Sequence, residues 1–192
     1  MFIMMKLYKG IRLVTVAPVM AAVMLVTLFL VRPAVFASAA SFWYALVFLT
    51  VLPLLAYPLQ KYIPAYRDRG REGQRGLAMN FAVAGYVLGC IANLFLKSTR
   101  ELWLIFLEYL FSGALIFLWN KCFHRKASGH ACGVAGPLAL LVAFGVYGAV
   151  LPGVLLLILV WLASIKTGRH TWRQLLGGTV IPIAVMAVLA LV

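Results

Sequence analysis

Long apolar segments recur from one end of this chain to the other, and they restrict it to membrane architectures. Of its 192 residues, 65% are hydrophobic, whereas a soluble domain is nearer half apolar. Because lipid offers the backbone no hydrogen bonds, spanning segments of this kind form helices. We therefore expect an all-α, polytopic transmembrane helical bundle of about six to seven spans. It should form one integral-membrane domain over residues 1–192.

Seven candidate spans can be placed on the chain. They cover about 12–31, 41–59, 77–96, 102–120, 131–150, 152–165 and 174–192. Residues 131–165 are divided in two because about 50 Å of helix is too long for one crossing of a roughly 30 Å core. The longest polar stretch, 60–75, is too short to bury a core of its own. No soluble domain is therefore expected.

The basic residues are distributed unevenly between the two expected membrane faces. The net charge is +13, from 17 Lys and Arg against 4 Asp and Glu. With seven crossings, fourteen of the 17 lie at the N-terminus or after the second, fourth and sixth spans. This bias predicts that the basic face is cytoplasmic, and the setting we expect is a bacterial inner membrane. Anionic lipid or phosphate is the expected partner, not nucleic acid, because no extramembrane domain could hold it.

Two polar segments each place a histidine beside glycine and cationic residues, directly before an apolar span. They read Lys-Ala-Ser-Gly-His at 126–130 and Lys-Thr-Gly-Arg-His at 166–170. The start of a helix binds anions through its unpaired N–H groups and its dipole. Ser128 can cap the fifth span, and Gly129 lets the backbone approach a ligand. The expected phosphate-binding residues are Ser128, Gly129, Lys126, Arg125, Lys121, Arg169, Arg69 and Arg75.

The two histidines can divide the chemistry of phosphoryl transfer. One can attack phosphorus to give a phosphohistidine, while the other protonates the leaving oxygen. Nearby cations would stabilise the transition state. No metal or other cofactor is required, and four acidic residues are few to hold one. The cysteines, Cys90, Cys122 and Cys132, lack metal-ligand spacing and are expected to be free thiols.

These residues resemble two signatures of the type-2 phosphatidic acid phosphatase superfamily, which consists of integral-membrane lipid phosphatases. Residues 128–130 match the end of its Pro-Ser-Gly-His motif, with Ala127 in place of proline. Its next motif places a histidine just before the last helix, as His170 is placed here. The resemblance implies that His130 is the general acid and His170 the nucleophile.

The third family signature is only partly present. In the family it reads Ser-Arg, five residues, His, three residues, Asp. Here Ser164 takes the place of the arginine and Gln174 that of the aspartate. Arg169 could replace the missing charge. The Gln174 carbonyl can still accept from the imidazole of His170, but it cannot stabilise an imidazolium as a carboxylate does, so a loss of rate is expected.

The first family signature, Lys, six residues, Arg-Pro, has no match in the chain. Its nearest substitutes are Lys121, Arg125 and Lys126, together with the basic loop at 67–75. The resemblance therefore places the phosphatase-like core at about 77–192. It implies a hydrolase that acts on a glycerolipid phosphate or a polyprenyl phosphate or diphosphate.

Two other functions fit the same residues. The chain could bind or transport a lipid phosphate without hydrolysis, as the replacements at Ser164 and Gln174 would allow. It could also be a phosphotransferase that passes phosphate from one lipid to another. Hydrolysis, binding and transfer all use the same anion site.

Overall fold

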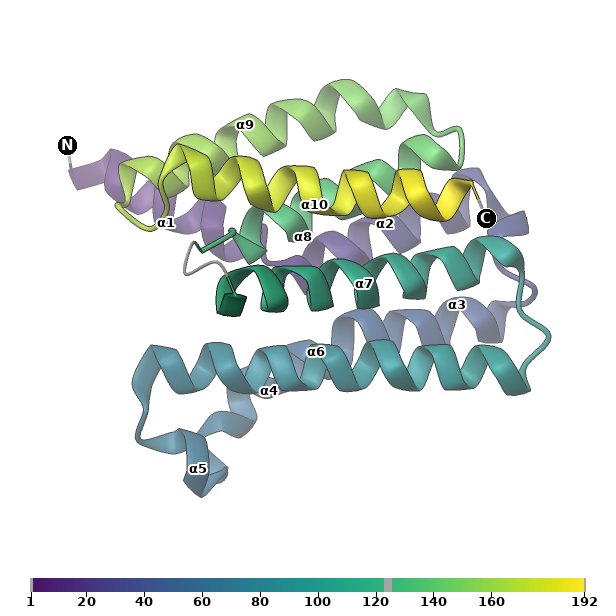
Figure 1. Ribbon diagram of the computed structural model, residues 1–192, viewed down its shortest axis with the longest axis horizontal. Helices are drawn as coiled ribbons and strands as arrows, with labels where there is room; N and C mark the ends of the chain where they lie inside the picture. The colour runs from purple at the N-terminus through teal and green to yellow at the C-terminus, as the bar shows by residue number, and fades with distance from the viewer. Residues whose placement is uncertain (1, 123–125, 192) are drawn as a thin grey trace. The chain divides into compact units, whose positions relative to one another are not determined.

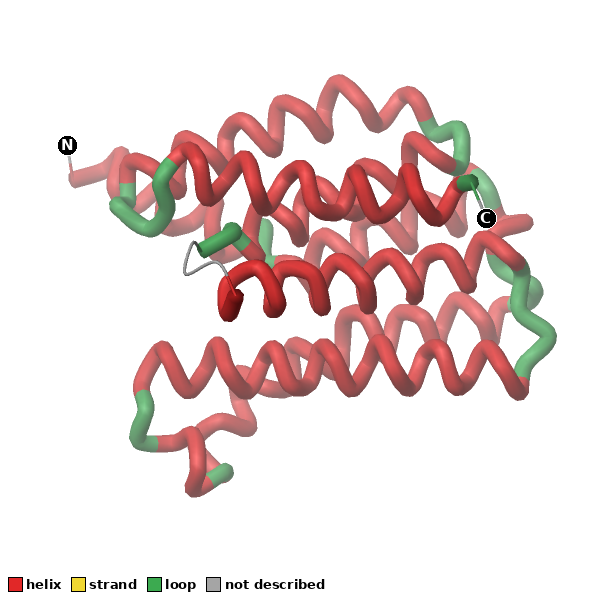
Figure 2. Tube along the Cα trace, viewed as in Figure 1, coloured by secondary structure: helices red, strands yellow, loops and turns green. Residues whose placement is uncertain are grey.

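The computed structural model describes residues 2–122 and 126–191, and this part of the chain is helical with no strand (Figures 1 and 2). The α-helices are α1 (Phe2–Val14), α2 (Ala17–Val31), α3 (Ala39–Leu46), α4 (Leu52–Leu59), α5 (Pro64–Arg67), α6 (Gly70–Phe95), α7 (Arg100–Cys122), α8 (Gly129–Ala143), α9 (Val150–Lys166) and α10 (Trp172–Ala190). A π-helical turn (Val47–Val51) joins α3 to α4, and short 3-10 turns follow α2, α4 and α8. The expected all-α class is confirmed.

Within the described residues, five helical segments are long and apolar enough to cross a membrane, as expected of an integral membrane protein. They are Ala39–Tyr62, Gly70–Phe95, Arg100–Cys122, Tyr147–Lys166 and Trp172–Leu189. The bent pair α1–α2 raises the number to as many as six. Each of the seven expected spans therefore corresponds to a helix or helix pair, but the first and fifth differ from expectation.

The first expected span, 12–31, is neither straight nor the start of the helical structure. Helix begins at Phe2 and is broken between Val14 and Ala17 by a bend of 59°. Pro18 stands in the first turn of α2. Proline is tolerated there because the first N–H groups of a helix have no partner, but it prevents continuation from a preceding helix. The basic N-terminus is consequently a helix of its own.

The fifth expected span, 131–150, is shorter than predicted. Helix α8 ends at Ala143, and Gly145 follows with φ of +77°, a left-handed conformation that glycine adopts without steric cost. Fifteen residues give about 22 Å of helix. That length is less than the roughly 30 Å hydrocarbon core of a bilayer. We therefore treat α8 as a short apolar helix rather than a full crossing.

The basic segment 67–75 is mostly helix, not the loop expected from its polarity. Helix α5 ends at Arg67, a turn follows, and α6 begins at Gly70. Arg, Glu and Gln all have high helix propensity, so α6 extends beyond its apolar part toward the polar side. Gly70 itself has φ of +51°, which lets the chain turn from α5 into α6.

The described chain divides into two compact units. Unit 1 consists of Met1–Met24 and Phe111–Val192, and unit 2 of Leu25–Leu110. Unit 1 contains α1 and the first part of α2, together with the second part of α7 and the last three helices, α8, α9 and α10. The expected phosphatase-like core at 77–192 stays a prediction. The single functional domain expected over 1–192 stays a prediction.

Candidate functional site

The second histidine cluster is shaped by the end of α9 and the start of α10. Helix α9 ends at Lys166 with Thr167 as its C-cap, and the next residue, Gly168, has φ of +64°. The N–H of Gly168 donates to Ile165 O at 2.9 Å, and that of Arg169 to Ser164 O at 3.0 Å. This pair of bonds is a Schellman motif, in which glycine supplies the left-handed residue. Gly168 therefore ends a helix, and the tight turn delivers His170 directly to α10.

The start of α10 fixes the orientation of the His170 ring. Thr171 and Gln174 form a capping box, in which Oγ1 of Thr171 accepts from Gln174 N and Oε1 of Gln174 accepts from Thr171 N. The same Oε1 lies 3.0 Å from Nδ1 of His170. Because Oε1 can only accept, Nδ1 carries a proton in this contact. The lone pair of a neutral His170 is then on Nε2.

The first cluster is anchored to α10 through backbone contacts. Ser128 is fully buried, and its Oγ caps α8 by accepting from Ala131 N at 3.3 Å, as predicted. Its own N–H donates to Gln174 O at 2.8 Å. Gly178 packs so closely against Ser128 that a Cβ there would clash with the serine backbone. The two histidine-bearing segments are thus joined at Gln174, one through its carbonyl and the other through its side chain.

His130 contacts the bend between α1 and α2. Its Nε2 lies 2.9 Å from Oγ1 of Thr15, a residue that is 3% exposed. The Thr15 hydroxyl donates its proton to Ile11 O at 2.7 Å. With that proton used, Oγ1 must accept from His130, so Nε2 carries a hydrogen. Any further proton that His130 gains is carried on Nδ1.

Arg12 is a member of this site that the sequence reasoning assigned only to membrane orientation. Its Nη1 donates to Oγ of Ser164 at 2.8 Å, and Ser164 is fully buried. A guanidinium therefore reaches Ser164 from α1. Arg169, the expected replacement, has an exposed side chain.

The side chains of Arg12, His130 and His170 interact electrostatically. Burial, the guanidinium of Arg12 and the imidazole of His170 together lower the pKa of His130 from 6.5 to about 4. His130 lies in the first turn of α8, outside the candidate membrane spans. It is therefore neutral at pH 7 in the unliganded site. Since an opposite charge favours the protonated form, a bound anion would raise this pKa.

Unit 1 contains no Asp or Glu anywhere in its sequence. The four acidic residues of the chain, Asp68, Glu72, Glu101 and Glu108, all fall within 25–110. Positive charge around His130 is therefore not balanced by a carboxylate side chain of the same unit. Such a cluster favours an anion, and among the described residues no group of His, Cys, Asp and Glu could hold a metal ion.

The other expected phosphate-binding residues are exposed, belong to unit 2 or lie outside the described residues. Gly129, Lys126, Lys121 and Arg169 are exposed at the surface of unit 1. Arg125 and His124 lie outside the described residues. Arg69 and Arg75 belong to unit 2. The three cysteines, all within the described residues, form no disulfide, as expected.

Within unit 1, the start of α8, the link between α9 and α10, and the end of α1 gather at one end (Figure 1). His130, His170, Gln174 and Ser128 are brought together there, along with Arg12 and Thr15, which the sequence reasoning missed. Comparison of the chain with models of known families, with curated proteins and with solved structures finds no match.

Proposed function

We propose that this protein is an integral-membrane phosphatase that hydrolyses a lipid or polyprenyl phosphate or diphosphate through a phosphohistidine, without a metal. The observation that carries the proposal is the cluster of Arg12, His130 and His170 in a unit that has no acidic side chain. His170 with its lone pair on Nε2 suits a nucleophile. The resemblance to the type-2 phosphatidic acid phosphatase superfamily supports the same roles.

The first half-reaction transfers the phosphoryl group to the protein. Nε2 of His170 forms a bond to phosphorus while the bond between phosphorus and the leaving oxygen breaks. His130, protonated once the substrate anion is bound, gives its Nδ1 proton to that oxygen. Arg12 stabilises the charge that remains on the equatorial oxygens. The dephosphorylated lipid then departs.

The second half-reaction restores the protein. Water attacks phosphorus, His130 takes a proton from it, and the bond from Nε2 to phosphorus breaks. Inorganic phosphate is the product. Gln174 holds the Nδ1 proton of His170 throughout, but as a neutral amide it stabilises positive charge on the ring less than a carboxylate would. We therefore expect slow turnover.

The test is phosphate release by purified protein from a phosphatidic acid and a polyprenyl diphosphate, in detergent containing EDTA. His170→Ala should abolish release, whereas His124→Ala, a matched loss of one histidine, should leave it unchanged. Acid-labile phosphate bound to wild-type protein would identify the intermediate. Wild-type turnover in His170→Ala, or activity that disappears with EDTA, would overturn the proposal.

A non-catalytic lipid-phosphate binder or transporter is the second candidate, favoured by the neutral Gln174 beside His170. Under that function the wild-type protein binds the lipid phosphate, but no phosphate is released and no phosphohistidine forms. A phosphotransferase would instead form the phosphohistidine and pass the group to an added lipid alcohol. Mass spectrometry of the lipid products separates transfer from hydrolysis.

A further inference from the structure

Unit 2 contains a hollow with basic walls, and none of its lining residues belongs to the histidine cluster of unit 1. Its volume is about 420 Å³, within the range of ligand sites, about 300–1,000 Å³. Three cations line it: Lys61 after α4, Arg67 at the end of α5, and Arg71 in the first turn of α6. Arg67 and Arg71 belong to the basic segment 67–75, whose charge was expected to serve the phosphate site, whereas Lys61 precedes that segment.

The other walls of this basic hollow make it amphiphilic. Tyr57 and Pro58 from α4 contribute apolar surface, and Gln60 and Gln74 contribute amides. Tyr57 and Pro58 lie near the end of the candidate span Ala39–Tyr62, and Arg71 lies at the beginning of the next, Gly70–Phe95. The hollow therefore lies where one candidate span ends and the next begins, and the ends of spans are where lipid headgroups are expected.

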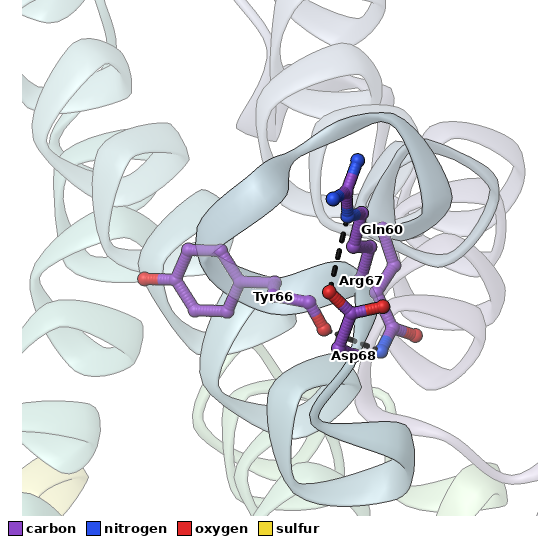
Figure 3. Close-up of polar contacts among 4 residues, drawn as sticks. All are labelled: Gln60, Tyr66, Arg67 and Asp68. Atoms are coloured by element: carbon purple, nitrogen blue, oxygen red, sulfur yellow. Dashed lines mark hydrogen bonds and ion pairs between the residues drawn. The ribbon is translucent and has the colours of Figure 1, made fainter.

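The shape of the basic hollow is held by a glutamine. Nε2 of Gln60 donates to Tyr66 O at 3.1 Å (Figure 3) and to Gly70 O at 2.7 Å. Gln60 therefore connects the end of the candidate span Ala39–Tyr62 to α5 and α6. The Tyr66 hydroxyl in turn accepts from Nδ2 of Asn80 at 2.7 Å. The turn that carries Arg67 is thus fixed to both neighbouring helices.

The cations of the basic hollow are only weakly neutralised by the chain itself. Asp68 accepts from Nε of Arg67 at 3.1 Å, but the two side chains are 81% and 56% exposed, and exposed pairs contribute little. In Figure 3 the rest of the guanidinium extends away from this carboxylate. Lys61 lies over the Tyr62 ring, 4.7 Å from its centroid. Neither Lys61 nor Arg71 forms an ion pair among the described residues.

We propose that the basic hollow binds the phosphate-bearing headgroup of a membrane lipid, as a site distinct from the histidine cluster. The guanidinium groups of Arg67 and Arg71 and the ammonium of Lys61 hold the phosphate. Tyr57 and Pro58 lie along the start of the lipid tails. Arg32 and Arg100 do not line the hollow, belong to the same unit and were assigned no part in the phosphate site, so they provide a control of equal charge.

The experiment measures binding by calorimetry with the full-length protein in an uncharged detergent. The probes are dihexanoyl phosphatidic acid, inorganic phosphate and dihexanoyl phosphatidylcholine. A His130→Ala/His170→Ala background removes turnover and weakens the first site, so the result does not depend on the proposed phosphatase activity. Circular dichroism and size exclusion check that every variant is folded.

Two charge-matched variants decide the outcome. Lys61→Gln/Arg71→Gln should weaken phosphatidic acid binding about tenfold or more, since charged hydrogen bonds are lost. Arg32→Gln/Arg100→Gln should change it less than about twofold, because neither side chain lines the hollow. Equal losses in both pairs, or none in either, would overturn the proposal. Inorganic phosphate that binds as tightly as the lipid would also overturn it, because the occupant would then be the free anion.

Discussion

Arg12 shows how one side chain distant in sequence can complete a site. It reaches Ser164, 152 residues away in the chain, and it lowers the pKa of His130 through its charge. A guanidinium so close to both histidine segments can bind the equatorial oxygens of a phosphoryl group. Under the proposed function, Arg12 would therefore serve the reaction as well as orient the N-terminus in the membrane.

We expect Arg12→Gln to lower kcat/KM for phosphate release by about a hundredfold or more, because a charge that stabilises the transition state is lost. Arg12→Lys should retain part of the activity, since lysine keeps the charge without the planar fork. The control is Lys9→Gln, which removes one charge from the same helix. Equal losses in the Arg12 and Lys9 variants would show that only the net charge of α1 matters.

The titration of His130 provides a second check at the residue scale. Its pKa of about 4 should be visible by NMR of labelled histidine in the free protein. Vanadate should raise this pKa because a bound anion favours the imidazolium, and Arg12→Gln should raise it because a repelling charge is removed. Since the folded pKa lies below the unfolded value, the free energy of unfolding should fall as pH decreases from about 6.5 to about 4. A pKa near 6.5 in the unliganded protein would contradict the arrangement described here.

Local contacts within the site were readable from sequence, whereas distant ones were not. His170 directly precedes the N-cap residue Thr171, and the capping box turns the Gln174 side chain back toward it, so their contact follows from the local pattern Thr-x-x-Gln. The cap at Ser128 follows from residue type. Thr15 and Arg12 approach His130 and Ser164 only because α1 packs beside α9 and the bend faces α8. No periodicity in one segment encodes such a contact.

At the scale of elements, hydropathy located the spans better than their ends or their continuity. An apolar window identifies the part of a helix that lipid surrounds, so it missed the polar first turns of α6 and the cationic α1. It also predicted one continuous helix over residues 131–150, because Gly145 interrupts the helix without interrupting the apolar run. Turn residues such as Pro18 and Gly145 carry the information that hydropathy lacks.

At the scale of the whole molecule, charge is divided between the two units. All four acidic residues belong to unit 2, whereas the charged side chains of unit 1 are all basic. Repulsion among like charges destabilises a compact state, and a ligand that neutralises them stabilises it. The thermal stability of this protein should therefore respond to oxyanions.

We expect vanadate to raise the Tm of the purified protein in an uncharged detergent, with a stabilisation of about 2.7 kcal/mol at a hundred times its Kd. Chloride at the same ionic strength should raise Tm much less, because it screens charge without filling the site. Arg12→Gln/His170→Ala should lose most of the vanadate effect, while Lys61→Gln/Arg71→Gln, which removes two cations from unit 2, should retain it. An equal rise with chloride, or an undiminished rise in Arg12→Gln/His170→Ala, would mean that the positive charge of unit 1 is only screened and that Arg12 and His170 do not form an anion site.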